Sequence, residues 1–362
     1  MEGTEEPEEE PELGLGGVNT EHPRYVANYV NGKEEGVVSA YYESGNLKWT
    51  GLYGNGLKKG IHKGYYEDGR LKWTAKFVKG LAQGPYREYY PDGVLKHEGW
   101  YKQGVEEGPH RWYYENGDLQ WVDTYEKGFE EGISREYYRN GVLKEERHYV
   151  HGILSGEHTG YYETGEIEWR VYRDQRKKSG TEIEYYENGN RKAEIPYVND
   201  VKSGIEKHYY ESGELLREDT MVNGQKCGIS REYYRNGNLK REVAYADSFC
   251  RQGIYREYYP NGMTELEGNC VNDKFDGNFK SYYETGELKE IAPFRDGILE
   301  GDLVRYYATG GLFEEITYHG GLMDGLYTKY GEYGEIEYKA LYREDMEAEV
   351  MEDSVRWLNM PV

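Results

Sequence analysis

The sequence has little of what a large globular core requires. Only 37% of its 362 residues are hydrophobic and the mean hydropathy is −0.99, so aliphatic side chains are scarce. No stretch approaches the run of about 18 apolar residues that a membrane-spanning helix needs, so such a helix is not expected. Low hydropathy with high charge also fits disorder, but an aromatic content of 15% weighs against it. The composition favours a repeat array, in which each unit shares a thin apolar face with its neighbours.

Cysteine is also scarce. Cys227, Cys250 and Cys270 are the only three, which fits a reducing compartment and provides no disulfide framework or metal-ligand spacing. Cys227 and Cys250 fall in equivalent loops of adjacent repeats, about 10 Å apart at two strands per repeat. A disulfide needs less than about 7 Å, so free thiols are predicted. The first thirty residues lack an apolar core, so no signal peptide is expected and the predicted location is cytoplasmic.

Positive charge is under-represented. The 45 lysines and arginines face 68 aspartates and glutamates, which gives a net charge of −23. Because nucleic acids and anionic membranes are themselves polyanions, neither is expected as a main partner. The charge favours protein partners, basic ones among them. The alternative is that the charge only keeps a long sheet from aggregating.

Catalytic signatures are missing. The sequence has no Walker-type phosphate loop and no His-Glu-x-x-His motif. The segment 273–277 lacks the alternating ligands of an EF-hand, and His148 and His151 have no third ligand nearby. A non-enzymatic protein without cofactor or metal is therefore predicted.

Tyrosine and glycine, in contrast, are abundant and periodic, with 41 and 48 copies. Tyr-Tyr pairs recur every 24 residues from Tyr41 to Tyr233, then at Tyr258, Tyr282 and Tyr306 after one inserted residue, and a variant copy starts at Tyr330. When the first tyrosine is position 1, glycine occupies positions 5 and 20 in nearly every copy and often position 16. Position 7 is usually Leu or Ile, and position 13 is usually aromatic. The spacing defines about thirteen repeats over residues 21–343.

Each repeat has the sequence features of a β-hairpin. Asn-Gly and Asp-Gly at positions 4 and 5 close tight turns. The stretch between positions 13 and 20 is predicted to be the return loop to the next hairpin, where the glycines at positions 16 and 20 allow a second reversal. The predicted fold is all-β: an elongated, single-layer antiparallel meander of tandem hairpins. With a two-residue turn, Tyr42, Leu47, Trp49 and Tyr53 share one face, while the other carries Tyr41, Lys48 and the often basic position 23. A longer turn would change this assignment.

These residues resemble the MORN repeat, and more closely its variant form in YwqK-like proteins, which reads Tyr-Tyr-Glu-Asn-Gly-x-Leu followed by Tyr-x-x-Gly-x-x-x-Gly. Residues 115–119 with Tyr125, Gly128 and Gly132 match it throughout. The resemblance covers about residues 25–343 and implies single-layer hairpin arrays that act in protein assembly. It also implies two alternatives: an antitoxin or immunity protein that neutralises a basic toxin, and a phospholipid-binding module.

The two ends differ from the repeats. Residues 1–20 are acidic and broken by proline, so a disordered tail is predicted. In residues 344–362, Met346, Val350, Trp357 and Leu358 have helical spacing, with Asp345 as an N-cap. We expect a short C-terminal helix that caps the last hairpin, with docking to a partner as the alternative.

The expected function is a protein–protein interaction scaffold with an aromatic-rich surface. Four tryptophans occupy position 9 and two lie nearby in sequence, and large aromatics dominate binding hot spots. Packing on a sheet poor in aliphatics is the alternative role. The candidate binding residues are Trp49, Trp73, Trp100, Trp112, Trp121 and Trp169.

Overall fold

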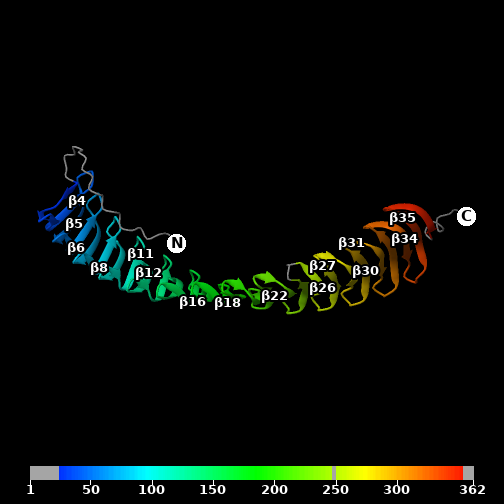
Figure 1. Cartoon of the computed structure of the whole chain (residues 1–362). Helices are drawn as coiled ribbons and strands as arrows, with labels where there is room; N and C mark the ends of the chain where they lie inside the picture. Colours follow the sequence, from blue (N-terminus) through cyan, green and yellow to red (C-terminus); the bar gives the residue numbers. More distant parts are fainter. Residues whose placement is uncertain (1–23, 247–249, 354–362) are drawn as a thin grey trace. The chain divides into compact units, whose positions relative to one another are not determined.

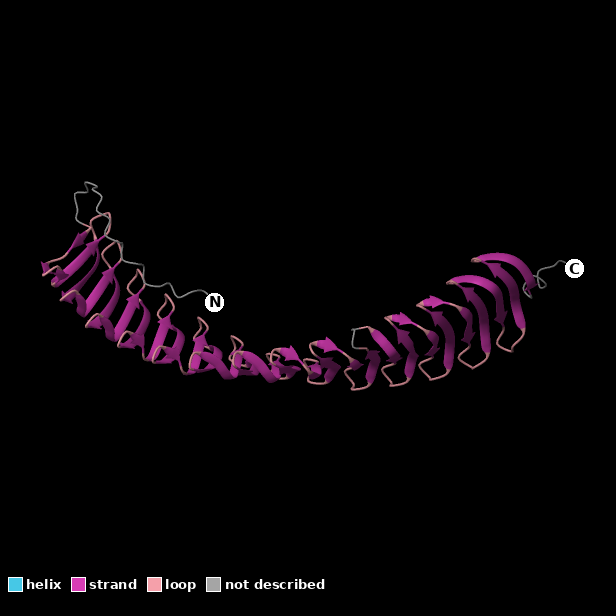
Figure 2. Ribbon diagram, viewed as in Figure 1, coloured by secondary structure: helices cyan, strands magenta, loops and turns pink. Residues whose placement is uncertain are grey.

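The computed structural model describes residues 24–246 and 250–353 and divides the chain into two units, Met1–Glu131 (unit 1) and Gly132–Val362 (unit 2). The predicted disordered tail, and Trp357 and Leu358 of the predicted helix, lie outside the described residues. Every regular element in the described part of the chain is a β-strand (Figure 2). None of the described segments is a helix that could span a membrane.

In each unit, consecutive strands pair antiparallel in sequence order, which confirms the predicted meander of hairpins (Figure 1). Strand β1 pairs with β4, while β2 and β3 form a separate hairpin. The strands of unit 1 are β1 (Tyr25–Val26), β2 (Tyr29–Val30), β3 (Lys33–Glu34), β4 (Gly36–Tyr41), β5 (Leu47–Gly54), β6 (Leu57–Tyr65), β7 (Leu71–Val78), β8 (Leu81–Tyr89), β9 (Leu95–Lys102), β10 (Val105–Glu106), β11 (Gly108–Tyr113), β12 (Leu119–Glu126) and β13 (Phe129–Glu130).

Unit 2 repeats the same pattern. Its strands are β14 (Gly132–Tyr137), β15 (Leu143–Val150), β16 (Ile153–Tyr161), β17 (Ile167–Asp174), β18 (Lys177–Tyr185), β19 (Arg191–Val198), β20 (Val201–Lys202), β21 (Gly204–Tyr209), β22 (Leu215–Val222), β23 (Gln225–Lys226), β24 (Gly228–Tyr233), β25 (Leu239–Tyr245), β26 (Arg251–Tyr258), β27 (Thr264–Val271), β28 (Lys274–Phe275), β29 (Gly277–Tyr282), β30 (Leu288–Arg295), β31 (Ile298–Leu299), β32 (Gly301–Tyr306), β33 (Leu312–His319), β34 (Leu322–Tyr330), β35 (Ile336–Arg343) and β36 (Met346–Asp353).

The turn that contains position 5 is longer than predicted. In the repeat that begins at Tyr41, Gly45 N–H donates to the carbonyl of Tyr42 at 3.0 Å, and Tyr42 N–H donates to the carbonyl of Asn46 at 2.8 Å. Three residues therefore form the loop, and Gly45 adopts a φ of 85°. A type I turn followed by a left-handed glycine is the common three-residue hairpin loop.

A β-bulge then corrects the register. Tyr41 pairs with Leu47, but the next pair is Ala40 with Trp49, so Lys48 is the extra residue. The two bulge residues, Lys48 and Trp49, point to the same side of the sheet. Lys48 Nζ lies 5.8 Å from the centre of the Tyr42 ring, which is on that side. The predicted face assignment was therefore wrong at two positions, because the bulge exchanges the faces of positions 7 and 8. The first face carries positions 2, 8, 9, 11, 13, 18, 22 and 24, and the second face carries positions 1, 7, 10, 12, 14, 17, 19, 21 and 23.

The tight two-residue turn lies instead at positions 15 and 16. Asn55 and Gly56 have φ angles of 54° and 76°, and Gly54 pairs with Leu57 across them. Two consecutive positive φ angles are typical of a type I′ turn, whose twist matches that of the strands. The strand therefore resumes at position 17, within the segment from 13 to 20 that the sequence suggested was a return loop.

The predicted C-terminal helix is wrong in its described part. Glu344 and Asp345 form another two-residue turn, with φ angles of 48° and 66°, and β36 pairs with β35 from Arg343–Met346 onward. Asp345 acts as a turn residue and not as an N-cap, because its N–H donates to the carbonyl of Met323 at 2.9 Å and its Oδ1 accepts from Met323 N–H at 2.7 Å. Pairing satisfies the backbone edge of β35, which a helix would leave open.

The core is a narrow row on the first face of each unit. Positions 11 and 22 are opposite one another and contribute most of the buried side chains, such as Val38 and His62 in unit 1 and Val171, Leu303 and Ile316 in unit 2. The larger side chains at positions 9, 13 and 18 flank this row, so residues are buried without a second layer. All three cysteines are free, as predicted.

Candidate interaction surface

The Tyr-Tyr motif has a structural use. The hydroxyl of the second tyrosine donates to the backbone carbonyl of the first tyrosine in the next repeat, as in Tyr66 to Tyr89 at 2.6 Å and Tyr162 to Tyr185 at 2.7 Å. The first tyrosine lies on the second face and often donates to a glutamate at position 10 of the preceding repeat, as Tyr113 does to Glu98 at 3.1 Å. The second tyrosine therefore links consecutive hairpins on the first face, and in several repeats the first tyrosine adds a bond on the second face.

Five of the six candidate tryptophans lie on the first face and are partly buried. In unit 1, Trp112 pairs across the strands with Trp121 and stacks on His97, with ring centres 4.4 Å apart and planes within 5°. Trp49 lies edge-on to Tyr25, and in unit 2 Trp169 contacts His158. These contacts occupy much of the indole surfaces with neighbouring side chains. A binding role for these five stays a prediction.

Trp100 differs from the others. It occupies position 12 on the second face, where 49% of it is exposed. The structure thus separates Trp100 from the tryptophans with which the sequence grouped it.

A buried pair of histidines lies at the centre of the first face of unit 1. His97 Nε2 and His110 Nδ1 are 3.1 Å apart, and His110 Nε2 lies 3.1 Å from the carbonyl oxygen of Trp100. A hydrogen bond between two imidazoles requires one of the facing nitrogens to be unprotonated. Burial lowers the pKa of His97 to about 3 and also lowers the pKa of His110, so both rings are neutral near pH 7.

The first face of unit 2 changes character along the chain. At its start, ionic groups occupy the core row. Arg147 binds both Glu136 and Glu145, and Glu145 lies 3.2 Å from His158. Although burial opposes ionisation of Glu145, hydrogen bonds from His158 and the nearby Arg147 charge lower its pKa.

Toward the end of unit 2 the same positions become apolar. Tyr255, Cys270 and Phe279 form one buried cluster, and Ala292, Leu303 and Ile316 form another. Phe275 stacks on Phe279 with ring centres 4.0 Å apart. The core row of unit 2 therefore contains ionic groups in its earlier repeats and is apolar in its later ones, where Arg305 still binds Glu290 and Glu314 beside the row.

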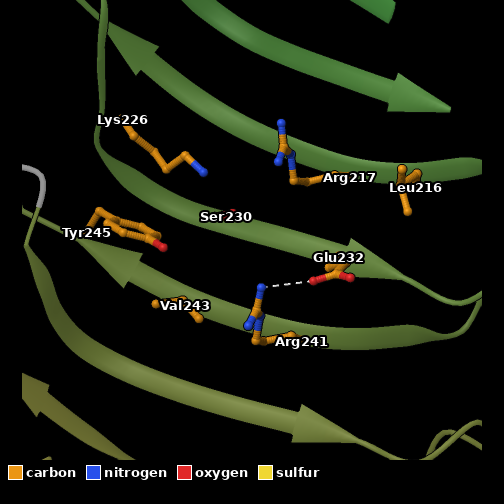
Figure 3. Close-up of a pocket in the computed structure, with 8 residues that line it drawn as sticks. All are labelled: Leu216, Arg217, Lys226, Ser230, Glu232, Arg241, Val243 and Tyr245. Atoms are coloured by element: carbon orange, nitrogen blue, oxygen red, sulfur yellow. Dashed lines mark hydrogen bonds and ion pairs between the residues drawn. The ribbon is translucent and has the colours of Figure 1, made fainter. Parts of the chain in front are cut away.

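A pocket of about 170 Å³ opens on the first face between these two parts of unit 2. Its polar side chains include Arg217, Lys226, Ser230, Glu232 and Arg241 (Figure 3). The described residues place no group of three His, Cys, Asp or Glu side chains where a metal ion could bind.

The second face carries a surface that the sequence analysis missed. Between residues 37 and 346, the exposed large apolar side chains lie at positions 12, 14, 17 and 21, apart from Met263 and Tyr333 in the three-residue turns. These positions form adjacent rows, because 14 pairs with 17 and 12 pairs with 21, as in Val78–Leu81 and Val37–Leu52. We call these rows the apolar strip. Its members in unit 1 are Val37, Leu52, Leu57, Ile61, Val78, Leu81, Trp100, Val105 and Phe129.

Unit 2 has its own apolar strip at the same positions. Its members are Ile133, Val150, Ile153, Tyr172, Val198, Val201, Ile205, Val222, Ile229, Ile254, Ile298, Leu322, Leu326 and Met346. Recurrent Leu, Val or Ile at position 17 was visible in the sequence. It could not be interpreted while that position was assigned to a return loop.

Comparison with known proteins gives one informative match. A family model described as "MORN repeat variant" matches nine segments, at residues 34–55, 82–103, 106–126, 130–151, 178–199, 202–223, 226–247, 251–272 and 275–296. No curated protein matches the chain.

Solved structures match only weakly. "Crystal Structure of TcdB2-TccC3-Cdc42" is 12% identical with a TM-score of 0.19, and the match covers 87% of this chain and 22% of that one. "Structure of Photorhabdus luminescens Tc holotoxin pore, Mutation TccC3-D651A" is also 12% identical, with a TM-score of 0.17 and coverage of 85% and 20%. The chain spans about a fifth of the length of these proteins, and overlaps of this quality do not bear on fold or function.

Proposed function

Because the chain belongs to the MORN repeat variant family, we propose that it is a non-enzymatic scaffold that binds protein partners through the apolar strip of its second face. Repeats of this family are generally interaction modules for proteins or membranes, which supports a binding role. The observation that carries the proposal is the concentration of the exposed large apolar side chains at four positions of the repeat.

The strip has the properties of a protein-binding surface. Soluble monomers rarely expose contiguous apolar patches larger than a few hundred Å², and larger patches usually mark interaction sites. The strip follows the repeats within each unit, so an extended partner can contact several repeats at once. Trp100 provides one large exposed aromatic within it, and such residues are often binding hot spots.

Charge favours different partners for the two units. Residues 24–131 contain 15 lysines and arginines against 16 aspartates and glutamates, whereas residues 132–353 contain 29 against 44. We therefore propose that basic partners dock mainly on unit 2, where electrostatic attraction would speed association.

The test is affinity capture with the full chain and with substituted strips. We expect the double substitution Ile61→Ser and Trp100→Ser to reduce recovery of specific partners at least tenfold, because both side chains are exposed and belong to the strip of unit 1. The matched control replaces Met263 and Tyr333 by serine, since both are exposed apolar residues outside the strip. Equal recovery with the strip variant and the control would contradict the proposal.

The same variants distinguish protein binding from the alternative of lipid binding. Co-sedimentation with anionic vesicles, lost in the strip variant and kept in the control, would assign the strip to membrane binding instead. Hydrogen exchange of each variant checks that the fold is retained. Surface substitutions of this kind usually change stability by less than about 0.5 kcal/mol.

A further inference from the structure

The pocket on the first face of unit 2 has a composition unlike the rest of that face. It lies over β22, β23, β24 and β25, and its side chains come from these four strands (Figure 3). Arg217 and Arg241 both occupy position 9, where unit 1 carries tryptophan or histidine. The close-up shows Lys226, Arg217 and Arg241 around the same space.

The two preceding repeats differ from this one in the partner of the lysine at position 18. Lys178 and Lys202, both at position 18, bind a glutamate at position 22 of the same repeat. Lys178 Nζ is 2.6 Å from Glu182 Oε2, and Lys202 Nζ is 3.0 Å from Glu206 Oε2. In the next repeat Lys226 also occupies position 18, but position 22 is Ser230. The carboxylate that neutralises Lys226 comes instead from Asp219 at position 11, which also binds Arg217.

The remaining carboxylates are shared among several donors. Asp219 lies 2.8 Å from both Lys226 Nζ and Arg217 Nε, and it also accepts from the Ser230 hydroxyl at 2.5 Å. Arg217 Nε is buried and is close to Asp219 without hydrogen-bond alignment. The two cations therefore have one buried carboxylate between them.

The other side of the pocket has the same imbalance. Glu232 binds both Lys240 and Arg241, at 2.7 and 2.9 Å. Glu257 is opposite Arg241 on β26, outside the pocket lining, and accepts from the Tyr255 hydroxyl at 2.6 Å. Among the lining side chains, three cations accompany the single carboxylate of Glu232, and Asp219 beside them adds a second carboxylate, although unit 2 as a whole is strongly acidic.

We propose that this pocket binds a phosphate group, either free or as a phosphomonoester. Three cationic side chains around one space suit a phosphate anion, because arginine and lysine are the usual donors to its oxygens. The phenol of Tyr245 adds a neutral donor at the lining. The volume of 170 Å³ holds about five or six waters at ~30 Å³ each, which is enough for a phosphate and too little for a nucleotide.

The test measures binding of inorganic phosphate to the full chain by calorimetry. We expect saturable binding that Ser230→Glu weakens at least tenfold, because this change restores the glutamate of the two preceding repeats. The variant should fold, since buried Glu182 and Glu206 occupy the same position. Lys226→Gln provides a second variant with the same expected loss. The matched control is Lys178→Gln, which removes a neutralised lysine at the same repeat position and should change the affinity less than twofold.

Two comparisons complete the experiment. A serine-phosphorylated peptide that binds at least tenfold more tightly than inorganic phosphate would identify a partner-borne phosphomonoester, and equal affinities would identify the free ion. Absence of saturable phosphate binding, or an equal loss in Lys178→Gln and Ser230→Glu, would overturn the proposal. The measurement does not involve the apolar strip, so its failure leaves the proposed scaffold function untouched, and the reverse also holds.

Discussion

Units 1 and 2 share one backbone design and differ in the chemistry of their first faces. In unit 1 the core row contains buried histidines among aromatic rings, such as His62 and His110. In the early repeats of unit 2 the same positions hold ions, such as Glu206 and Asp219. The turns, bulges and tyrosine links define the hairpin, and the positions between them accept any side-chain set that satisfies its own polar groups.

The largest expected difference between the units is the stability cost of adding a side chain at position 11, beside the histidines of unit 1. A Cβ placed on Gly99 would overlap the ring of His110, whereas position 11 is already valine at Val171 and Val243 in unit 2. Gly99→Val should therefore cost about 3 kcal/mol, the upper range for overpacking. Chemical denaturation, monitored by hydrogen exchange, would measure this loss of stability. Adding His110→Ser, a residue that unit 2 carries at this position, should recover most of the loss, and a failure to recover would show that the overlap is not the cause.

The second largest expected difference is in how the stability of each unit falls as the pH is lowered. The folded-state pKa of His97 is about 3, below the ordinary value of 6.5, so its contribution is complete above pH 6.5 and is lost as the pH falls toward 3. At about 1.36 kcal/mol per pH unit, unit 1 should lose about 2 kcal/mol between pH 6.5 and pH 5. The carboxylates of unit 2, including Glu145 and Asp219, have lowered pKa values, so their contribution is lost only below about pH 4.

Hydrogen exchange at pH 7 and pH 5 measures this difference unit by unit. The control is the double variant His97→Leu and His110→Phe, because Leu266 and Phe279 occupy the same two repeat positions in unit 2. It should remove most of the pH dependence of unit 1 in this range. Equal acid sensitivity of the two units in the native chain would show that the histidine pair is not responsible.

The two-residue turns should give a smaller difference. Position 16 is glycine throughout unit 1, as at Gly128, but is not glycine in four described turns of unit 2, among them Arg176 and Asp200 with φ of 71° and 69°. A left-handed conformation costs a non-glycine residue about 1 kcal/mol. Gly128→Arg should therefore destabilise unit 1 by about 1 kcal/mol, and Arg176→Gly should stabilise unit 2 by a similar amount. Thermal unfolding of the two variants checks this, and changes of the same sign would contradict it.

The smallest expected difference is in the stability cost of removing a tyrosine link, the hydrogen bond from the second tyrosine of a pair to the next repeat. The Tyr90 hydroxyl donates to the Tyr113 carbonyl at 2.8 Å in unit 1, and the Tyr186 hydroxyl donates to the Tyr209 carbonyl at 2.9 Å in unit 2. Tyr→Phe at either site should cost about 1 kcal/mol, the usual contribution of one hydrogen bond. The two losses, measured by urea denaturation, should agree within about 0.5 kcal/mol. A clear inequality would mean that the links are not equivalent between units.

The sequence alone determined the architecture of this protein. The 24-residue period, the recurrent glycines and the strand-forming residues between them predicted an array of hairpins, and the sparse cysteines predicted free thiols. These features depend on local conformational preferences and spacing, which a single sequence displays directly.

Only the tertiary structure decided which side chains share a face. One bulge residue per hairpin exchanged Leu47 and Lys48 between faces, and a side-chain period of two makes every such assignment depend on exact register. Residues 346–353 likewise form a strand despite their helical spacing, because they pair with the open backbone edge of β35. The apolar strip and the cationic pocket both follow from that register, because each gathers residues that lie in different strands of neighbouring repeats.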